Sequence, residues 1–323
     1  MTTIDGSRET PGPATRHLGL DLGGTNLKWA VLERSVGTWA MVARDQARTR
    51  IVPDADRVPD AIVAQMGELA VAAIDAWGPV ASVGIGVPGL YDPATGATRF
   101  LPNVPGRWAG HPVGAPVMAA TGLPVSLIND ARAFGLAELR LGAARGASTM
   151  IGLALGTGVG GVVIVNGEVH FGHDGTAGEI GHQTIDPDGP WCGCGNRGCL
   201  EAYARADQVA AACGTATAEE AVRAAQAGDA RALGGLADVG RYLGIGIASM
   251  INIISPDVIV IGGGVAAAGE LLFAPIRAEI ARRATMTPLD RVTLVPAELG
   301  VWAGAYGAAV HGSDRAARGA GAA

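Results

Sequence analysis

The sequence predicts an α/β fold built from two related halves. Strand-like segments alternate with helix-like segments along the 323 residues, and hydrophobic residues make up 49% of the chain, enough for a sizeable core. The segment LGLDLGGTNLKWAVL, starting at Leu18, also aligns without a gap with IGLALGTGVGGVVIV, starting at Ile151. Gly23 then falls on Gly156, and both segments consist of a strand, a glycine turn and a second strand. We therefore expect each half to present a glycine turn to a shared cleft.

The hydrophobic pattern places the individual elements. Residues 17–21 and 27–32 are expected as strands on either side of the first glycine turn. Residues 58–77 have apolar side chains at helical spacing, and residues 80–87 form an apolar strand that ends at Pro88. The remaining expected elements are strands at 125–128 and 258–261 and helices at 131–141, 241–254, 270–283 and from residue 304 onward. This order is the alternation of strands and helices on which the α/β prediction rests.

The composition argues against several classes of protein. The formal net charge is −6, whereas a nucleic-acid binder usually has a basic face. Residues 1–16 are polar, so we expect a flexible leader and no signal peptide, and no apolar stretch approaches the roughly 20 residues of a membrane helix. Three of the four cysteines lie too close together for a disulfide framework, which favours a reducing compartment, the cytoplasm.

Three glycine turns offer backbone N–H groups to an anion such as phosphate. The turn at 21–25 adds a carboxylate and a hydroxyl, and a carboxylate beside phosphates favours a magnesium ion. A second turn follows at 156–158 and a third at 262–264, where a strand ends. Any one of them could be an ordinary hairpin of a glycine-rich protein, and none ends in the Gly-Lys-Ser or Gly-Lys-Thr of a Walker motif. The matching pair and the third turn together favour a phosphate-binding site.

Asp130 is the candidate catalytic base. It follows the strand expected at 125–128 and precedes a helix, and ligands of open α/β sheets bind at the carboxyl ends of strands. A carboxylate there can accept the proton of a hydroxyl that attacks phosphorus. The alternative is that Asp130 caps the helix beginning at Ala131. The neighbouring phosphate turns favour the base.

One histidine and three cysteines have the types and spacing of four zinc ligands. They are His182, Cys192, Cys194 and Cys199. The alternative is a set of small buried side chains, but the surrounding glycines argue against core packing. Four protein ligands leave no open position, so the zinc would be structural. Glu179 and Glu201 flank the cluster, and together with a fixed His182 N–H donor they would suit sugar hydroxyls, although Glu201 also fits the first turn of a helix.

These motifs resemble the ROK family of bacterial sugar kinases and repressors, within the actin-like ATPase superfamily. The resemblance rests on DLGGTNLKWA, LPNVPGRW, IND, LGTGVGG, GEIGH and CGCGNRGCLE, which occur in this order between about residues 18 and 311. It implies a two-lobed actin-like (ribonuclease H-like) ATPase fold with a central cleft. A small N-terminal lobe would comprise residues 17–130 plus 303–316, and a large lobe residues 131–302 with a zinc-binding loop at 182–199.

The resemblance also implies roles for the residues that match the family motifs. Asp130 would be the general base on the sugar hydroxyl. The residues expected to bind sugar are Gly89, Asn103, Asn129, Asp130, Glu179, His182 and Glu201. The residues expected to hold ATP phosphates and magnesium are Asp21, Gly23, Gly24, Thr25, Gly156, Thr157 and Gly158, with Gly263 and Gly264 on the nucleoside side. Zinc is expected at His182, Cys192, Cys194 and Cys199.

The implied activity is ATP- and magnesium-dependent phosphorylation of a hexose, first of all glucose to glucose 6-phosphate. Other acceptors that fit are N-acetylmannosamine, N-acetylglucosamine, fructose and cyclitols, and polyphosphate could replace ATP. Asn26, where many family members carry lysine, and Trp108, Gly110 and His111 at the end of the sugar-loop segment depart from common members. These departures affect the choice of substrate more than the reaction.

Two other functional classes fit the sequence less well. A sugar-responsive repressor of the same family would carry a winged-helix segment, for which the roughly 16 residues before the first motif are too few. A filament-forming actin relative gives no role to the cysteine cluster. The expected partners are therefore a small sugar or sugar-like substrate, no nucleic acid and no membrane, in a homodimer or homotetramer that the resemblance implies.

Overall fold

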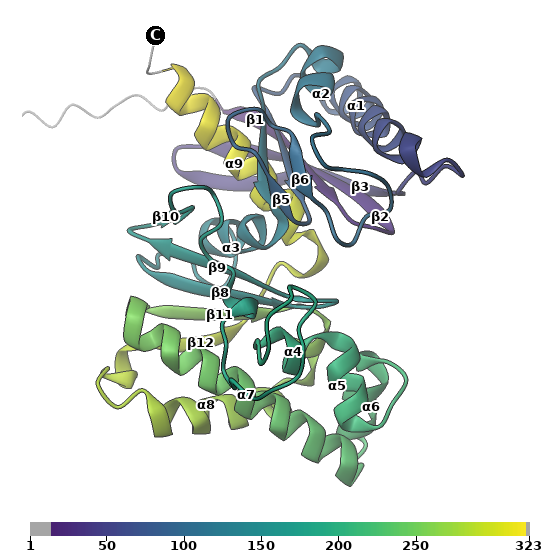
Figure 1. Cartoon of the computed structure of the whole chain (residues 1–323). Helices are drawn as coiled ribbons and strands as arrows, with labels where there is room; N and C mark the ends of the chain where they lie inside the picture. Colours follow the sequence, from purple (N-terminus) through teal and green to yellow (C-terminus); the bar gives the residue numbers. More distant parts are fainter. Residues whose placement is uncertain (1–13, 321–323) are drawn as a thin grey trace, which may run out of the picture.

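The computed structural model describes residues 14–320, which form two mixed β-sheets with helices between and outside them (Figure 1). The strands of the first sheet, in the order β3-β2-β1-β4-β7, are β1 Thr15–Leu22, β2 Asn26–Ser35, β3 Thr38–Arg48, β4 Val83–Val87 and β7 Val125–Asn129. Those of the second sheet, in the order β10-β9-β8-β11-β12, are β8 Met150–Leu155, β9 Val159–Val165, β10 Glu168–Val169, β11 Val258–Gly262 and β12 Thr293–Pro296. Strands β5 (Leu90–Tyr91) and β6 (Thr98–Phe100) form a separate small hairpin.

The two sheets have the same topology, which confirms the predicted internal repeat. In each sheet the first strand pairs antiparallel with the second and parallel with the fourth, and the fourth pairs parallel with the fifth. The glycine turns differ slightly. Leu22 pairs with Leu27 across the first turn, whereas Leu155 pairs with Val159 across the second, which is therefore one residue shorter.

Helices α3 (Asp130–Arg140) and α9 (Ala303–Ala320) contact each other and lie between the two sheets (Figure 1). Their apolar side chains share one core with residues of β2, β8 and β9. The outer side of the first sheet carries α1 (Val58–Trp77) and α2 (Gly114–Thr121), and that of the second carries α4 (Glu201–Ala204), α5 (Ala206–Cys213), α6 (Ala218–Gln226), α7 (Ala230–Ile254) and α8 (Glu270–Arg283). The catalytic helix predicted after Asp130 thus lies at the centre of the molecule.

Two glycines allow α9 to approach the first sheet closely. A Cβ atom on Gly19 would lie 1.9 Å from the carbonyl oxygen of Ala305, and one on Gly84 would lie 1.8 Å from that of Ala308. Any side chain at these positions would displace the helix. The close contact brings the first turn of α9 next to Asp21 on β1, because a Cβ on Gly304 would lie 2.7 Å from either carboxylate oxygen.

Most elements expected from the sequence are present, with differences at their ends. The helix expected at 241–254 is the second half of α7, which begins at Ala230 after an Asp229 cap that accepts a hydrogen bond from Ala232 N at 2.8 Å. The strand expected at 80–87 begins at Val83. Strand β3 was not expected at all. Among residues 14–320, every helix is too short or too polar to cross a membrane.

The predicted leader covers residues 1–16, of which 1–13 lie outside the described residues. Its last two residues belong to β1, because Thr15 pairs with Arg34 and the Arg16 side chain bonds Glu33 at 3.0 Å. The predicted lobe boundary at 302/303 falls at the start of α9, and the one at 130/131 falls one residue after the start of α3. We retain them as a proposal.

Candidate active site

The carboxyl ends of three parallel strands bring the predicted phosphate and catalytic residues together. Asp21 on β1 pairs with Gly86 on β4, and Val87 on β4 pairs with Asn129 on β7. Asp130 follows directly as the first residue of α3. Because parallel strands end at a common edge of the sheet, Asp21 and Asp130 face the same region from different strands.

Asn129, and not Asp130, caps helix α3. Its Oδ1 accepts hydrogen bonds from Ala131 N at 3.0 Å and Arg132 N at 3.2 Å, which is the geometry of an N-cap. Its Nδ2 donates to the carbonyl oxygen of Gly89 at 3.1 Å. The capping role considered for Asp130 therefore belongs mainly to its neighbour, although Asp130 Oδ1 also accepts a hydrogen bond from Ala131 N at 2.8 Å.

The environment of Asp130 suits a base that works near neutral pH. Burial, and after it the charge of Asp21, raises the pKa of Asp130 to about 7. Glu179 acts in the same direction, whereas the Ala131 N–H and Arg132 oppose it. A carboxylate with a pKa near 7 is a stronger proton acceptor than an ordinary one and is still substantially ionised.

Asp21 shares the site with a lysine. Lys28 Nζ lies 3.5 Å from Asp21 Oδ2 across the first hairpin, and both side chains are largely buried. Burial raises the pKa of Asp21 above its usual value, against the opposing effect of Lys28. Lys28 lies two residues after Asn26 on β2, so both side chains point to the same face of the strand.

The first glycine turn is held by backbone bonds. Gly23 N donates to Asn26 O at 3.0 Å, and Thr49 Oγ1 donates to Gly23 O at 2.7 Å. A Cβ on Gly24 would lie 2.3 Å from the carbonyl oxygen of Asn103. The structure thus brings Asn103, predicted for sugar binding, against the predicted phosphate turn, where Thr25 is exposed.

The second and third glycine turns adjoin each other. Gly156 N donates to Gly158 O at 2.9 Å, and the Thr157 side chain is exposed. Gly263, at a φ of +91°, lies where a Cβ would come within 2.1 Å of Leu155 O, immediately before the second turn. Gly264 follows it at the start of a short 3-10 helix, exposed like Gly263. The predicted nucleoside-side residues therefore adjoin the predicted phosphate residues.

The predicted metal ligands meet in a geometry that fits zinc. The Sγ atoms of Cys194 and Cys199 are 3.7 Å apart, and His182 Nδ1 lies 3.7 Å from Cys192 Sγ. Ligand atoms of all four residues lie within 4.8 Å of one another. Atoms bound at about 2.0 to 2.3 Å to a tetrahedral ion lie about 3.5 to 3.8 Å apart, so this donor set matches zinc. With Nδ1 turned to the cluster, His182 Nε2 remains for another partner.

Glu201 joins the cysteine cluster to the second glycine turn. Its Oε2 accepts a hydrogen bond from Val159 N at 2.9 Å, and its Oε1 lies 3.6 Å from Cys192 Sγ. It is also the first residue of α4, as its alternative interpretation required. The sequence did not indicate the bond to Val159, because it joins residues that are far apart along the chain.

Sequence reasoning overlooked Arg132. This residue lies two positions after Asp130, its side chain is 2% exposed, and its Nη2 lies 3.1 Å from Glu179 Oε1. It connects the catalytic helix to a residue predicted for sugar binding. An arginine inside an apolar helix pattern carries no sequence signal for a partner that lies 47 residues away.

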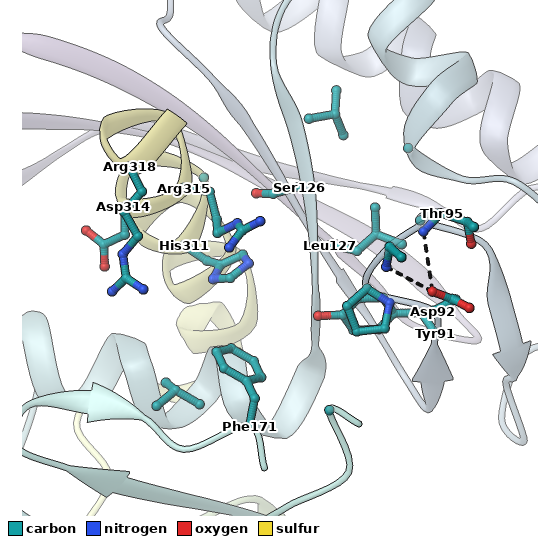
Figure 2. A pocket seen from close by; sticks show the side chains of 18 of the residues that line it. Tyr91, Asp92, Thr95, Ser126, Leu127, Phe171, His311, Asp314, Arg315 and Arg318 are labelled. Atoms are coloured by element: carbon teal, nitrogen blue, oxygen red, sulfur yellow. Dashed lines mark hydrogen bonds between the residues drawn. The ribbon is translucent and has the colours of Figure 1, made fainter. Parts of the chain in front are cut away.

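A large cavity lies apart from this site. Its volume is about 1170 Å³, and its lining includes Tyr91, Ser126, Phe171, His311 and Arg315 from the β5–β6 hairpin, β7, the segment after β10, and α9 (Figure 2). None of the residues predicted for catalysis, sugar, phosphate or zinc lines it. Its size alone therefore does not identify the reaction centre.

Comparisons with known proteins identify the family that the sequence motifs resemble. The ROK family model matches residues 17–314. A glucokinase of Thermotoga maritima is 34% identical over 287 residues, which cover 83% of this chain and 88% of that protein. The ROK hexokinase of Thermus thermophilus has a TM-score of 0.79 at 34% identity and covers 94% of this chain and 100% of its own.

A ROK family glucokinase of Streptomyces griseus, solved in complex with glucose and AMPPNP, is also similar. Its TM-score is 0.76 at 31% identity, with coverage of 93% of this chain and 99% of that one. These similarities confirm the predicted two-lobed actin-like ATPase fold.

Proposed function

This chain belongs to the ROK family, and on that premise we propose that it phosphorylates a hexose with ATP, with glucose as the first candidate. The observation that carries the proposal is Asp130, whose pKa is raised to about 7 at a strand end shared with Asp21. The Streptomyces griseus relative, bound to glucose and AMPPNP, supports both the acceptor and the donor.

Asp130 would act as the base. As a sugar hydroxyl oxygen attacks the γ-phosphorus of ATP, its proton passes to the Asp130 carboxylate. The bond between the γ-phosphorus and the bridging oxygen of the β-phosphate breaks, and ADP leaves with that oxygen. The products are a sugar phosphate, ADP and a proton that Asp130 later returns to solvent.

The glycine turns would hold the nucleotide. Backbone N–H groups at 23–25 and 156–158 suit the phosphates, with the Thr25 and Thr157 hydroxyls beside them. Gly263 and Gly264 would flank the nucleoside. Asp21 would hold a magnesium ion, which would offset phosphate charge, because carboxylate oxygens beside phosphates are typical magnesium ligands.

The sugar hydroxyls would be bound mainly by half-buried or exposed polar side chains. Asn103 and Glu179 are exposed and His182 is half-buried, so these side chains are accessible to hydroxyls. Gly89 would line the pocket with its backbone. Glu201 and Asn129 already accept backbone N–H groups, so they would contribute their remaining polar atoms.

The four-ligand cluster would bind a structural zinc ion that fixes His182 and, through Cys192, the position of Glu201. We expect about one zinc per chain by elemental analysis, because the four ligands make one site. Removal of zinc by a chelator should lower the melting temperature and the activity together. A zinc-free chain that keeps both would contradict this role. The family also leads us to expect a homodimer or homotetramer, which light scattering would measure.

A panel of acceptors with ATP tests the function. Glucose, fructose, N-acetylmannosamine, N-acetylglucosamine and a cyclitol would each be supplied, with ADP release as the readout and polyphosphate as a second donor. We expect glucose with ATP and magnesium to give the highest kcat/KM. Sugar-dependent ADP release that is absent for every acceptor would overturn the proposal, and a preference for another acceptor would reassign the substrate.

A further inference from the structure

Arg132 is a buried cation that the proposed reaction has not yet used. Of the fully buried side chains in residues 14–320, it is the largest. A buried charge costs several kcal/mol unless hydrogen bonds compensate it, so its partners are expected to matter. It stands on α3, two residues after Asp130.

The guanidinium directs its donors to one segment. Its Nε and Nη2 bond the carbonyl oxygen of Ala177 at 3.1 and 2.7 Å, and Nη2 also bonds Glu179 Oε1 at 3.1 Å. Among the described residues, Glu179 is its one acidic partner. A single side chain therefore holds both the backbone and the carboxylate of the segment that presents Glu179.

That segment has little structure of its own. Between β10, which ends at Val169, and the 3-10 helix at Ile180–His182, the chain forms neither helix nor strand. Three of its residues, at 172, 175 and 178, are glycines with φ between +72° and +96°. Such a backbone has high conformational freedom when unfolded, so it depends on outside contacts to hold one conformation.

Helix α3 is in contrast firmly fixed. It lies between the two sheets, and Asn129 caps its first turn. A Cβ on Gly160 of β9 would lie 2.7 Å from the Cβ of Ala131, which shows how closely the helix packs. An arginine on this helix can therefore set the place of this glycine-rich segment relative to Asp130.

We infer that Arg132 is a positioning residue for sugar recognition, which holds the Glu179 carboxylate at a fixed place relative to the Asp130 carboxylate. This rests on the proposed function and deepens it, because it ties acceptor binding to the catalytic helix. Arg132 itself is too buried to touch the sugar. It acts through Glu179 and Ala177.

Arg132→Met tests this positioning, since methionine is long and apolar enough for the buried site. The KM for the sugar should rise about 10- to 100-fold, because small misplacements of binding groups have effects of this size. The KM for ATP should change by less than about twofold, since Arg132 does not contact either glycine turn. Amide exchange over residues 170–179 should become faster, measured by mass spectrometry without substrate.

Two further variants separate positioning from a general loss of structure. Arg132→Lys keeps the positive charge but lacks the planar guanidinium group. Its sugar KM should therefore lie between that of the wild type and that of Arg132→Met. Arg140→Met, on the same helix, removes an arginine that lies 3.8 Å from Glu168, and it should leave the sugar KM unchanged. Melting temperatures of all three variants would be compared.

The outcomes distinguish this inference from the proposed function. If the wild-type chain is active and Arg132→Met changes neither the sugar KM nor the amide exchange, the inference about Arg132 is overturned and the proposed function stands. Equal increases of both KM values in Arg132→Met and Arg140→Met would also overturn it. A wild-type chain without sugar-dependent ADP release would overturn the proposed function and, with it, the sugar role of Arg132.

Discussion

The two glycine hairpins occupy equivalent places in sheets of the same topology, but they carry different side chains. The first hairpin holds a buried pair, Asp21 and Lys28, whose charged atoms are 3.5 Å apart. The equivalent paired positions in the second hairpin are Ala154 and Gly160. A Cβ on Gly160 would lie 2.7 Å from the Cβ of Ala131, so helix α3 packs closely on the second hairpin.

The second hairpin receives its carboxylate from outside. Glu201 bonds Val159 N at 2.9 Å and reaches the turn from the cysteine cluster. One half thus carries its acid on its own strand, whereas the acid at the other comes from α4, next to the cysteine cluster. We infer that the first hairpin serves the chemistry, and that the second serves nucleotide binding and the packing of the catalytic helix.

The largest expected effect comes from Asp130, the proposed base. Asp130→Asn should lower kcat about 10³-fold, because the amide cannot accept the hydroxyl proton. Sugar binding, measured by titration calorimetry, should change little. Asp75→Asn, an exposed position on α1, is the matched control. Near-normal turnover in Asp130→Asn would remove the base assignment.

Asp21→Asn tests the charge of the first hairpin. We expect kcat to fall about 10²-fold, since one preorganised charged group at the phosphates is lost. In the wild type, kcat/KM should decrease as pH falls through about 7, where Asp130 becomes protonated. Because the charge of Asp21 raises the pKa of Asp130, the variant should have a lower midpoint. A pH–rate profile with an unchanged midpoint would show that the two carboxyls are not coupled.

Glu201→Ala tests the hydrogen bond between the Glu201 carboxylate and the second hairpin. It leaves Val159 N without its acceptor, and a hydrogen bond to a charged group contributes about 1.5 to 3 kcal/mol. The KM for ATP should therefore rise about tenfold or more, with a smaller change in kcat. Glu201→Gln keeps an acceptor oxygen and should remain close to wild type. If both variants instead weaken sugar binding and spare ATP, the bond to Val159 does not serve the nucleotide, and only the proposed sugar role of Glu201 remains.

The local motifs could be predicted from the sequence, and the contacts between distant segments could not. Asp130 and the four candidate metal ligands lie in short patterns whose chemistry is set by residue type and spacing. Arg132 was missed because its partner lies in another segment. The internal repeat predicted two related halves, and the order of the strands in each sheet became known only from the structure.

Strand β3 was missed because it lacks a hydrophobic pattern. It is an edge strand in which Ala43 is the one buried residue, so its sequence shows no apolar face. The first half of α7 was also missed, and it contains Gly234 and Gly235. A Cβ on Gly235 would lie 2.8 Å from the backbone of Ala212, so this glycine serves the packing of α7 against α5.

The smallest expected effect concerns Asn129, at the start of the helix that packs on the second hairpin. The resemblance assigns it to sugar binding, whereas the structure gives it the cap of α3. Asn129→Ala should lower the free energy of unfolding by about 1 kcal/mol, as loss of an N-cap does. Asn129→Ser loses the contact with Gly89 but keeps a capping oxygen. Because the cap is kept, its free energy of unfolding, measured by urea denaturation, should be near that of the wild type. If both variants keep full stability and share a raised sugar KM, Asn129 is a sugar ligand first, and α3 is held in place by its packing between the two sheets.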